Sequence, residues 1–258
     1  MCGRYTLTMP IDSMRELFGF DAQPNLAARY NVAPGQDIPV VRINDAGTGR
    51  QLAGFNWGLV PSWVKDPATA NPMINARSET VSEKPSFRAA FQRRRCLIPA
   101  NGFYEWTSVS KGIKQPYYIQ LEGGEPFAFA GIWERWEGGD GDHWETCALM
   151  TTVATEALMP IHHRMPVILP PESYETWMVG DVKVVGELMV PHFGLTEAWP
   201  VATLVNNIRN DGSELVVKAE PLALPPTPAQ RAGSRFIFYL FIIFITKVQY
   251  TIGATILL

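Results

Sequence analysis

Cys2 directly follows the initiating methionine, in the segment Met1–Arg4. A small residue in second place normally permits removal of Met1, which would leave Cys2 with both an α-amine and a thiol. Because an α-amine has a pKa of roughly 7.7–8.0, part of it is neutral and nucleophilic at pH 7. It can condense with an aldehyde to a Schiff base, and the thiol can then close a five-membered ring. Cys2 is therefore a candidate nucleophile, although chance also places cysteine here.

Asn75, Arg77 and Glu79 alternate within residues 73–80. If this segment is extended, the three side chains share one face. An amide beside a guanidinium suits the binding of a sugar hydroxyl and a phosphate. The alternative interpretation is the polar face of an edge strand.

Glu105 stands among aromatic residues in the segment 101–106, which reads Asn-Gly-Phe-Tyr-Glu-Trp. A carboxylate in apolar surroundings is costly to bury unless it is paired or protonated. Burial would raise the pKa of Glu105 and make it a proton donor or acceptor near neutrality. On a strand edge it would instead be an ordinary surface glutamate.

Two adjacent histidines, His162 and His163, precede Arg164. Histidine exchanges protons at physiological pH, and the neighbouring arginine would favour an anionic substrate. Adjacent histidines seldom point the same way in an extended segment, so we expect no metal site. A structural role for the pair is the alternative, and chemistry alone does not decide which ring faces Cys2.

Trp57 and Trp63 frame a segment that contains glycine and proline. Tryptophans on a loop can stack on nucleic-acid bases or wedge a strand end. Packing in the core is the alternative for each of them.

The elements that must position these residues are mainly short strands. Strands are predicted where β-branched and aromatic residues gather: Ile38–Ile43, Leu52–Val60, Cys96–Pro99, Gly102–Thr107, Pro116–Leu121, Phe127–Trp133 and Trp144–Val153. A helix is expected before Gly19, because Ser13 and Glu16 have the spacing of a capping box. Others are expected after Pro170 and around Lys183–Leu188. The pattern predicts an α+β fold, a mostly antiparallel sheet or barrel with peripheral helices.

The composition is that of a globular protein, with 258 residues, 47% hydrophobic and 18% charged. A net charge of −3 gives no overall sign of nucleic-acid binding, although Arg93–Arg95 form a local basic run. The three cysteines show no CxxC spacing and we expect no secretory leader, so a cytoplasmic location is favoured. Cys96 and Cys147 are expected to be buried packing residues.

The composition changes near residue 222. We predict one domain over residues 1–222, a flexible linker over 223–235 and a hydrophobic tail of unknown role over 236–258. The first apolar run of the tail spans about 10 residues, fewer than the roughly 20 that cross a bilayer. A longer span would place Lys247 near the middle of the membrane. A membrane anchor and an unstructured or non-native extension are the two alternatives, and the second is favoured.

Seven segments, taken together and in order, resemble the SRAP family (SOS response-associated peptidase). They are Met1–Tyr5, Arg29–Gly35, Trp57–Trp63, Asn75–Glu79, Asn101–Trp106, Ile161–Pro166 and Val205–Leu215. The resemblance runs from residue 1 to about residue 220 and does not include the tail. It implies the SRAP fold.

The resemblance also implies an activity: recognition of abasic sites in single-stranded DNA and their capture as a covalent thiazolidine crosslink to Cys2. The crosslink would shield the site from strand cleavage. Asn75 would position the open sugar, Glu105 would move protons, and His162 would assist ring opening and crosslink reversal. Candidates for DNA contacts are Arg4, Trp63, Arg77, Trp106 and Arg164. We expect no cofactor, no metal, a monomer, and association with the nucleoid when damaged DNA is bound.

Two other classes of function stay open. A cysteine-dependent peptidase or amidase would use Cys2 as its nucleophile, as the family name suggests, and self-cleavage after Met1 would expose the same residue. A DNA-binding module without catalysis would need no chemistry at Cys2 at all.

Overall fold

The structure, a computed structural model, describes residues 2–139, 141–192, 194 and 196–222. Its contacts divide the chain into two units: Met1–Ser108 with Lys114–Pro221, and Val109–Ile113 with Leu222–Leu258. The predicted linker and tail, residues 223–258, lie outside the described residues. The site residues predicted from the sequence all belong to the first unit.

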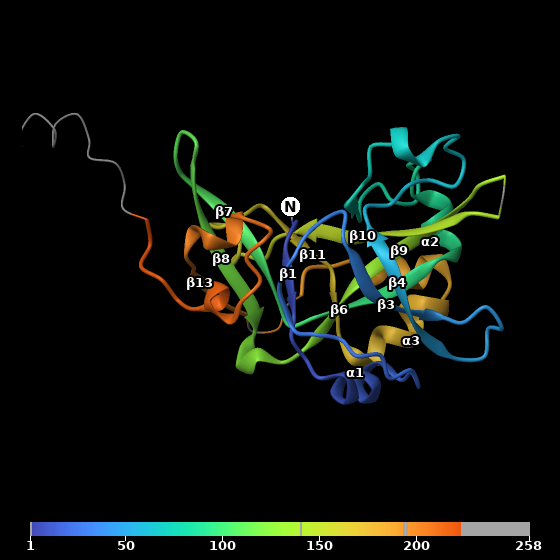
Figure 1. The fold of residues 1–258 in the computed structure, drawn as a ribbon, viewed down its shortest axis with the longest axis horizontal. Coiled ribbons are helices and arrows are strands. Elements are labelled where there is room, and N and C mark those ends of the chain that lie inside the picture. The colour runs from blue at the N-terminus through green and yellow to red at the C-terminus, as the bar shows by residue number, and fades with distance from the viewer. Residues whose placement is uncertain (1, 140, 193, 195, 223–258) are drawn as a thin grey trace, which may run out of the picture. The chain divides into compact units, whose positions relative to one another are not determined.

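Strands dominate the first unit (Figure 1). They are β1 (Tyr5–Leu7), β2 (Arg29–Val32), β3 (Asp37–Ile43), β4 (Arg50–Trp57), β5 (Asn75–Arg77), β6 (Arg95–Ala100), β7 (Gly102–Ser110), β8 (Ile113–Leu121), β9 (Phe127–Glu137), β10 (His143–Val153), β11 (Arg164–Pro166), β12 (Ile168–Leu169) and β13 (Thr196–Pro200). The helices are α1 (Ile11–Phe18), α2 (Arg88–Arg93), α3 (Tyr174–Val179) and α4 (Val182–Glu187). Within the described residues, no helix has the length and apolarity needed to cross a membrane.

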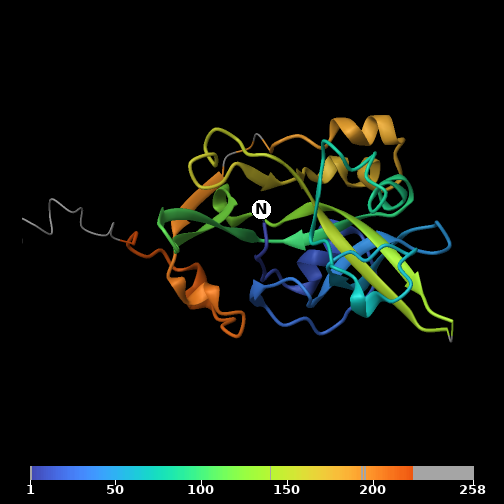
Figure 2. The ribbon, with the colours of Figure 1, turned by 90° about the horizontal axis from the view of Figure 1, so that it is seen from above.

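The strands form two sheets. One has the order β13-β8-β7-β1-β2. In the other, β10 pairs with β4, β4 with β3, β3 with β6, β6 with β9, and β9 again with β10, so these strands close a barrel. The strands β5 and β11 both pair with β10. Figure 2 shows the long β9–β10 hairpin extending beyond the other barrel strands. The predicted α+β fold with a mostly antiparallel, barrel-like core is confirmed.

All seven predicted strands are present: β7 and β8 belong to the other sheet, and the remaining five form the barrel. Trp57 and both Cys96 and Cys147 are fully buried there, which confirms the packing interpretation for each. The seven predicted strands did not include β1, β2, β5, β11, β12 or β13. These strands are two to five residues long, so they are too short to show a periodic pattern of their own.

The three predicted helices are present, as α1, α3 and α4, whereas α2 was not predicted. α1 ends at Gly19, whose φ of 70° is the left-handed conformation that glycine tolerates best. Its N-cap, however, is Pro10, and no side chain caps it. The predicted capping box at Ser13 and Glu16 is therefore wrong, because the helix begins two residues earlier and Ser13 lies inside it.

The helices α1 and α3 close the same end of the barrel (Figure 1). Phe18 of α1 stacks on Tyr174 of α3 with ring centroids 5.4 Å apart. Trp177 donates its indole N–H to the carbonyl oxygen of Cys96 at 2.9 Å, which ties α3 to β6. Tyr174, Trp177 and Met178 of α3 are buried.

Candidate active site

Cys2 lies just before β1, and the register of β1 decides what faces it. Tyr5 pairs with Phe103 of β7 in antiparallel fashion, and Tyr104 donates its backbone N–H to the carbonyl oxygen of Arg4 at 3.0 Å. Continuing this ladder brings Glu105 beside the segment that carries Cys2. Cys2 is fully buried. Burial, reinforced by the charge of Glu105, raises the pKa of its thiol well above the ordinary range.

Asn75 reaches Cys2 from β5, which runs parallel to β10. Its amide Nδ2 donates to the carbonyl oxygen of Cys2 at 2.9 Å. Its Oδ1 is buried and has no hydrogen-bond partner among the described residues. A buried amide oxygen without a donor costs free energy, and a ligand hydroxyl would satisfy it. Asn75 therefore both fixes the Cys2 backbone and offers an acceptor beside it.

Glu105 is buried on β7 with 3% of its surface exposed, as its aromatic neighbours in the sequence predict. Burial raises the pKa of this carboxyl to about 7. A group with that pKa exchanges protons readily at neutral pH, which is what a general acid or base requires.

His162 lies next to Glu105. Both line one small cavity, whose lining is Phe103, Glu105, Ile119, Leu158, Ile161, His162 and Arg164. Nδ1 of His162 accepts the backbone N–H of Arg164 at 3.0 Å. Burial lowers the pKa of the imidazole, and His163 and Lys114 act in the same direction. The neighbouring ring of His163 is exposed, so the structure places His162 as the inner histidine.

Arg164 supports this site from β11. Its guanidinium binds both carboxylate oxygens of Glu79 and donates to the carbonyl oxygen of Thr151 at 2.6 Å. Only 9% of the Arg164 side chain is exposed, against 48% for Glu79. These contacts occupy the guanidinium and link β11 to β10. The predicted contact of Arg164 with a phosphate would require this ion pair to open.

The Arg164–Glu79 pair leads to a first prediction. Glu79→Gln is expected to lower the free energy of unfolding by about 1–2 kcal/mol at pH 7, because a largely buried guanidinium loses its charged acceptor in a partly screened pair. The hydrogen bond from Arg164 lowers the pKa of Glu79, so its contribution is present at neutral pH and is lost as the pH falls. Denaturant titrations at pH 7 and pH 3 measure both effects.

The control for this prediction is Asp12→Asn, which breaks the exposed Arg15–Asp12 pair. It should change the free energy of unfolding by less than about 0.5 kcal/mol. Equal effects of the two substitutions at pH 7 would contradict the structural role of the Arg164–Glu79 pair.

The remaining candidates for DNA contacts differ in exposure. Arg77 is exposed at the end of β5, and Trp63 is 66% exposed on the loop after β4. Arg4 is half-buried and donates to Asn31 Oδ1 at 2.8 Å and to the carbonyl oxygen of Val205 at 2.7 Å. Trp106 donates its indole N–H to Asn206 Oδ1 at 2.8 Å. Arg77 and Trp63 are therefore presented to a ligand, whereas Arg4 and Trp106 also hold the segment 205–206.

Asn31 has a role that the sequence prediction missed. It is buried on β2, and its Nδ2 donates to the carbonyl oxygens of Val205, Asn207 and Asn210 at 2.8–3.2 Å. The backbone of β2 is fixed in turn by Asp211. The only local signal was an asparagine between Tyr30 and Val32, which does not identify partners 174 to 179 residues away.

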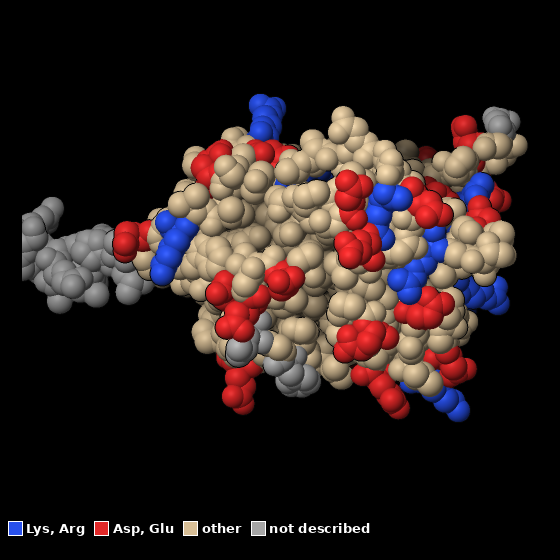
Figure 3. Space-filling model, turned by 90° about the horizontal axis from the view of Figure 1, so that it is seen from below, with Lys and Arg blue, Asp and Glu red and all other residues tan. Residues whose placement is uncertain are grey.

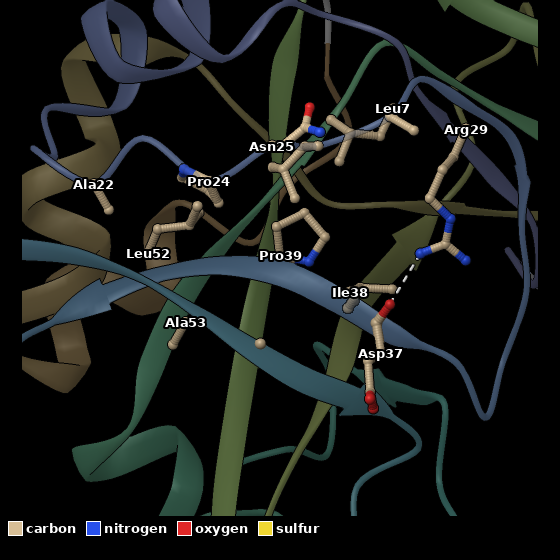
Figure 4. Close-up of a pocket in the computed structure, with 13 residues that line it drawn as sticks. Leu7, Ala22, Pro24, Asn25, Arg29, Asp37, Ile38, Pro39, Leu52 and Ala53 are labelled. Carbon is tan, nitrogen blue, oxygen red and sulfur yellow. Dashed lines mark hydrogen bonds between the residues drawn. The ribbon is translucent and has the colours of Figure 1, made fainter.

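A second cavity, of about 480 Å³, lies between residues 22–29 and the strands β3 and β4 (Figure 4). Its walls are apolar, with Pro24, Pro39 and Leu52 among them, and Arg29 donates to the carbonyl oxygen of Asp37 at 2.9 Å at its rim. None of the predicted site residues lines it. Glu105, His162 and Arg164 line the smaller cavity instead.

The surface charges are mixed. On the face drawn in Figure 3, acidic and basic side chains lie among one another, with uncharged areas between them. This matches the net charge of −3. Among the described residues, no group of three or more His, Cys, Asp or Glu side chains is arranged to hold a metal ion.

The chain is similar to known proteins over most of its length. It is 41% identical to the abasic site processing protein YoqW of Bacillus subtilis over 223 residues, which cover 84% of this chain and 99% of that protein. It is 31% identical to the abasic site processing protein YedK of Escherichia coli, and the match covers 84% of this chain and 99% of that protein. An X-ray structure of a protein from Bacteroides thetaiotaomicron superposes with a TM-score of 0.75 at 27% identity, covering 85% of this chain and all of that one.

The match to a family as a whole agrees with these relatives. Residues 1–208 match the family described as SOS response associated peptidase. This range contains the strands of both sheets and every predicted site residue. Six of the seven segments that carry the resemblance lie inside this range, and the seventh, Val205–Leu215, begins inside it and ends beyond it. The chain belongs to the SRAP family.

Proposed function

We propose that this protein processes abasic sites, and that it does so by binding single-stranded DNA and crosslinking Cys2 to the open sugar. The observation that carries the proposal is the convergence of Cys2, Asn75, Glu105 and His162 on one site. It is supported by the relatives that are named abasic site processing proteins.

The proposed chemistry needs no group beyond the chain and the DNA. Once Met1 is removed, the α-amine of Cys2 attacks the C1′ aldehyde of the open abasic sugar, and the carbinolamine loses one water to give an imine. The thiol sulfur then adds to the imine carbon while its proton passes to the nitrogen, which closes a thiazolidine. Because both nucleophiles belong to one residue, the second step is intramolecular and gains a large effective molarity.

The neighbouring residues take roles that their positions suit. Glu105, with a pKa of about 7, protonates the departing hydroxyl of the carbinolamine and afterwards takes up protons released at Cys2. Asn75 Oδ1 accepts a hydrogen bond from a hydroxyl of the open sugar. This hydroxyl supplies the donor that the buried oxygen lacks among the described residues. His162 exchanges a proton during opening of the sugar and reversal of the crosslink.

Single-stranded DNA is proposed to cross the exposed side of this site. Arg77, at the end of β5, contacts a phosphate, and the exposed ring of Trp63 stacks on a base. A few such contacts suffice in a protein of net negative charge, because each phosphate contact is local.

We predict that Arg77→Ala weakens binding of single-stranded DNA and lowers the slope of log K against log salt by about one, as expected for one lost phosphate contact. Fluorescence anisotropy at several salt concentrations measures both quantities. Arg88→Ala, at an exposed arginine that begins α2, is the control and should leave the slope unchanged. An unchanged slope for Arg77→Ala, or an equal change in both variants, would contradict the proposed path of the DNA.

A peptidase or amidase that uses the Cys2 thiolate is the second candidate, since the family is described as peptidases. Burial and the charge of Glu105 raise the pKa of the Cys2 thiol, which disfavours the thiolate that such an enzyme needs. Attack by an α-amine avoids this difficulty. A mass measurement distinguishes the two functions: peptide or amide hydrolysis by mature protein that forms no DNA adduct would favour the peptidase.

A further inference from the structure

The ring of His163 lies against the ring of His162. Their centroids are 4.4 Å apart and their planes meet at 24°, so the two imidazoles are stacked. His163 is exposed, whereas His162 is half-buried and lines the cavity that contains Glu105. The outer ring therefore covers one face of the inner ring.

The orientation of His162 has two sources. Nδ1 accepts the N–H of Arg164 at 3.0 Å and lies 3.2 Å from the carbonyl oxygen of the same residue. Proton exchange with a substrate therefore runs through Nε2. These backbone contacts fix one edge of the ring, and the stacked ring of His163 limits rotation of the remainder. The backbone of His163 is itself held, because its carbonyl oxygen accepts the N–H of Ala154 at 3.1 Å.

The two rings are also coupled by charge. Positive charges at this separation repel each other, so a charge on the outer ring disfavours a proton on His162. Two other charged or titratable side chains line the cavity with His162: Glu105 on β7 and Arg164 on β11. Lys114 on β8 acts on His162 through its charge. His163 is the more exposed of the two adjacent rings.

We propose that His163 is a positioning residue for His162: its ring holds the direction of Nε2, and its charge opposes protonation of His162. This inference rests on the proposed function, because it concerns the step in which His162 exchanges a proton during crosslink reversal. His163 would thereby set the lower pH limit of reversal and keep the inner imidazole neutral over a wider pH range.

The test compares His163→Phe, which keeps a stacked ring without charge, with His163→Ala, which removes both. The rate of crosslink reversal is followed from pH 5 to pH 8 with a preformed adduct on an oligonucleotide. In His163→Phe we expect the rate at its optimum to stay within about threefold of the wild type and the acidic limb to move up by about 0.5–1 pH unit. His163→Ala should show the same shift and a rate about tenfold lower, because Nε2 is less well aimed.

A second readout needs no DNA. Titration of the His162 ring followed by NMR should move to higher pH in both variants and stay in place in His143→Phe, a control at an exposed histidine that begins β10. Unchanged pH profiles and ring titrations in both His163 variants, with crosslinking intact in the wild type, would overturn this inference and leave the proposed function standing. A wild-type protein that forms no crosslink would overturn the proposed function, while the ring titrations would still decide the coupling.

Discussion

Cys2→Ala is expected to abolish the heat-resistant adduct between this protein and an oligonucleotide that carries one abasic site. The substitution leaves the α-amine, so an imine still forms, but no thiol is present to close the ring. A Schiff base without ring closure hydrolyses in water, whereas the intramolecular thiol acts with an effective molarity of roughly 10⁵ M or more. We therefore expect the adduct to fall to the level of an undamaged strand on a denaturing gel after heating.

Cys2→Ser and Cys96→Ala complete this experiment. Cys2→Ser offers an amine and a hydroxyl, so its adduct should be trapped by borohydride yet lost on heating. Cys96→Ala makes the same truncation at another fully buried cysteine, inside the barrel, and should crosslink like the wild type. A heat-resistant adduct of undiminished yield in Cys2→Ala would be incompatible with a thiazolidine.

Glu105→Gln is expected to slow crosslink formation by about 10²–10⁴-fold at pH 7, the usual contribution of one general acid or base. The amide keeps the size of the side chain but exchanges no proton. Single-turnover formation of the adduct, measured from pH 5 to pH 9, is the appropriate assay. In the wild type the rate should change near pH 7, where Glu105 titrates, and this feature should be absent in Glu105→Gln.

Although Glu105→Gln is expected to slow crosslink formation, it is expected to stabilise the folded protein above neutral pH. Burial raises the pKa of Glu105 from 4.5 to about 7, so the folded state holds this proton more tightly than the unfolded state. The free energy of unfolding of the wild type therefore decreases as the pH rises from about 4.5 to 7, by at most about 3 kcal/mol from this group. Glu105→Gln should be more stable than the wild type at pH 8 and nearly equal to it at pH 4.5.

Thermal melts at the two pH values measure this difference. The exposed residue Glu83 provides the control, since Glu83→Gln should change stability little at either pH. If Glu105→Gln were less stable than the wild type at pH 8, the carboxyl would be ionised and favourably paired, and its assignment as a proton-transfer group would be wrong.

The barrel strands could be predicted from the sequence because their apolar and β-branched residues are contiguous and long enough to show a pattern. β1 and β11 could not, since each has only three residues and is a strand only because β7 or β10 pairs with it. These two short strands are nevertheless the ones that position Cys2 and His162. The chemical types of the site residues could therefore be predicted from the sequence. That these residues lie close together follows from the register of β1 and β11, which the sequence does not show.

Other features of the site left no local signal. Arg164 and Glu79 are separated by 85 positions, and the polar segment that contains Glu79 suggested a shared binding face rather than an ion pair with Arg164. Asn31 anchors the segment 205–210 from a strand that is 174 to 179 positions away in sequence. The stacking of His163 on His162 depends on the turn that joins β10 to β11. Each of these contacts depends on tertiary structure, which cannot be predicted from hydrophobic patterns or secondary-structure propensities alone.

The central claim, covalent capture of an abasic site by Cys2, is tested most directly by intact-mass analysis of the adduct. Mature protein, shown by its mass to lack Met1, is mixed with a single-stranded oligonucleotide carrying one abasic site, and the adduct is then digested and sequenced by tandem mass spectrometry. We predict one adduct whose mass is the sum of protein and DNA less one water, with the modification on Cys2. Mature protein that forms no adduct, or an adduct located on a lysine, would contradict the claim.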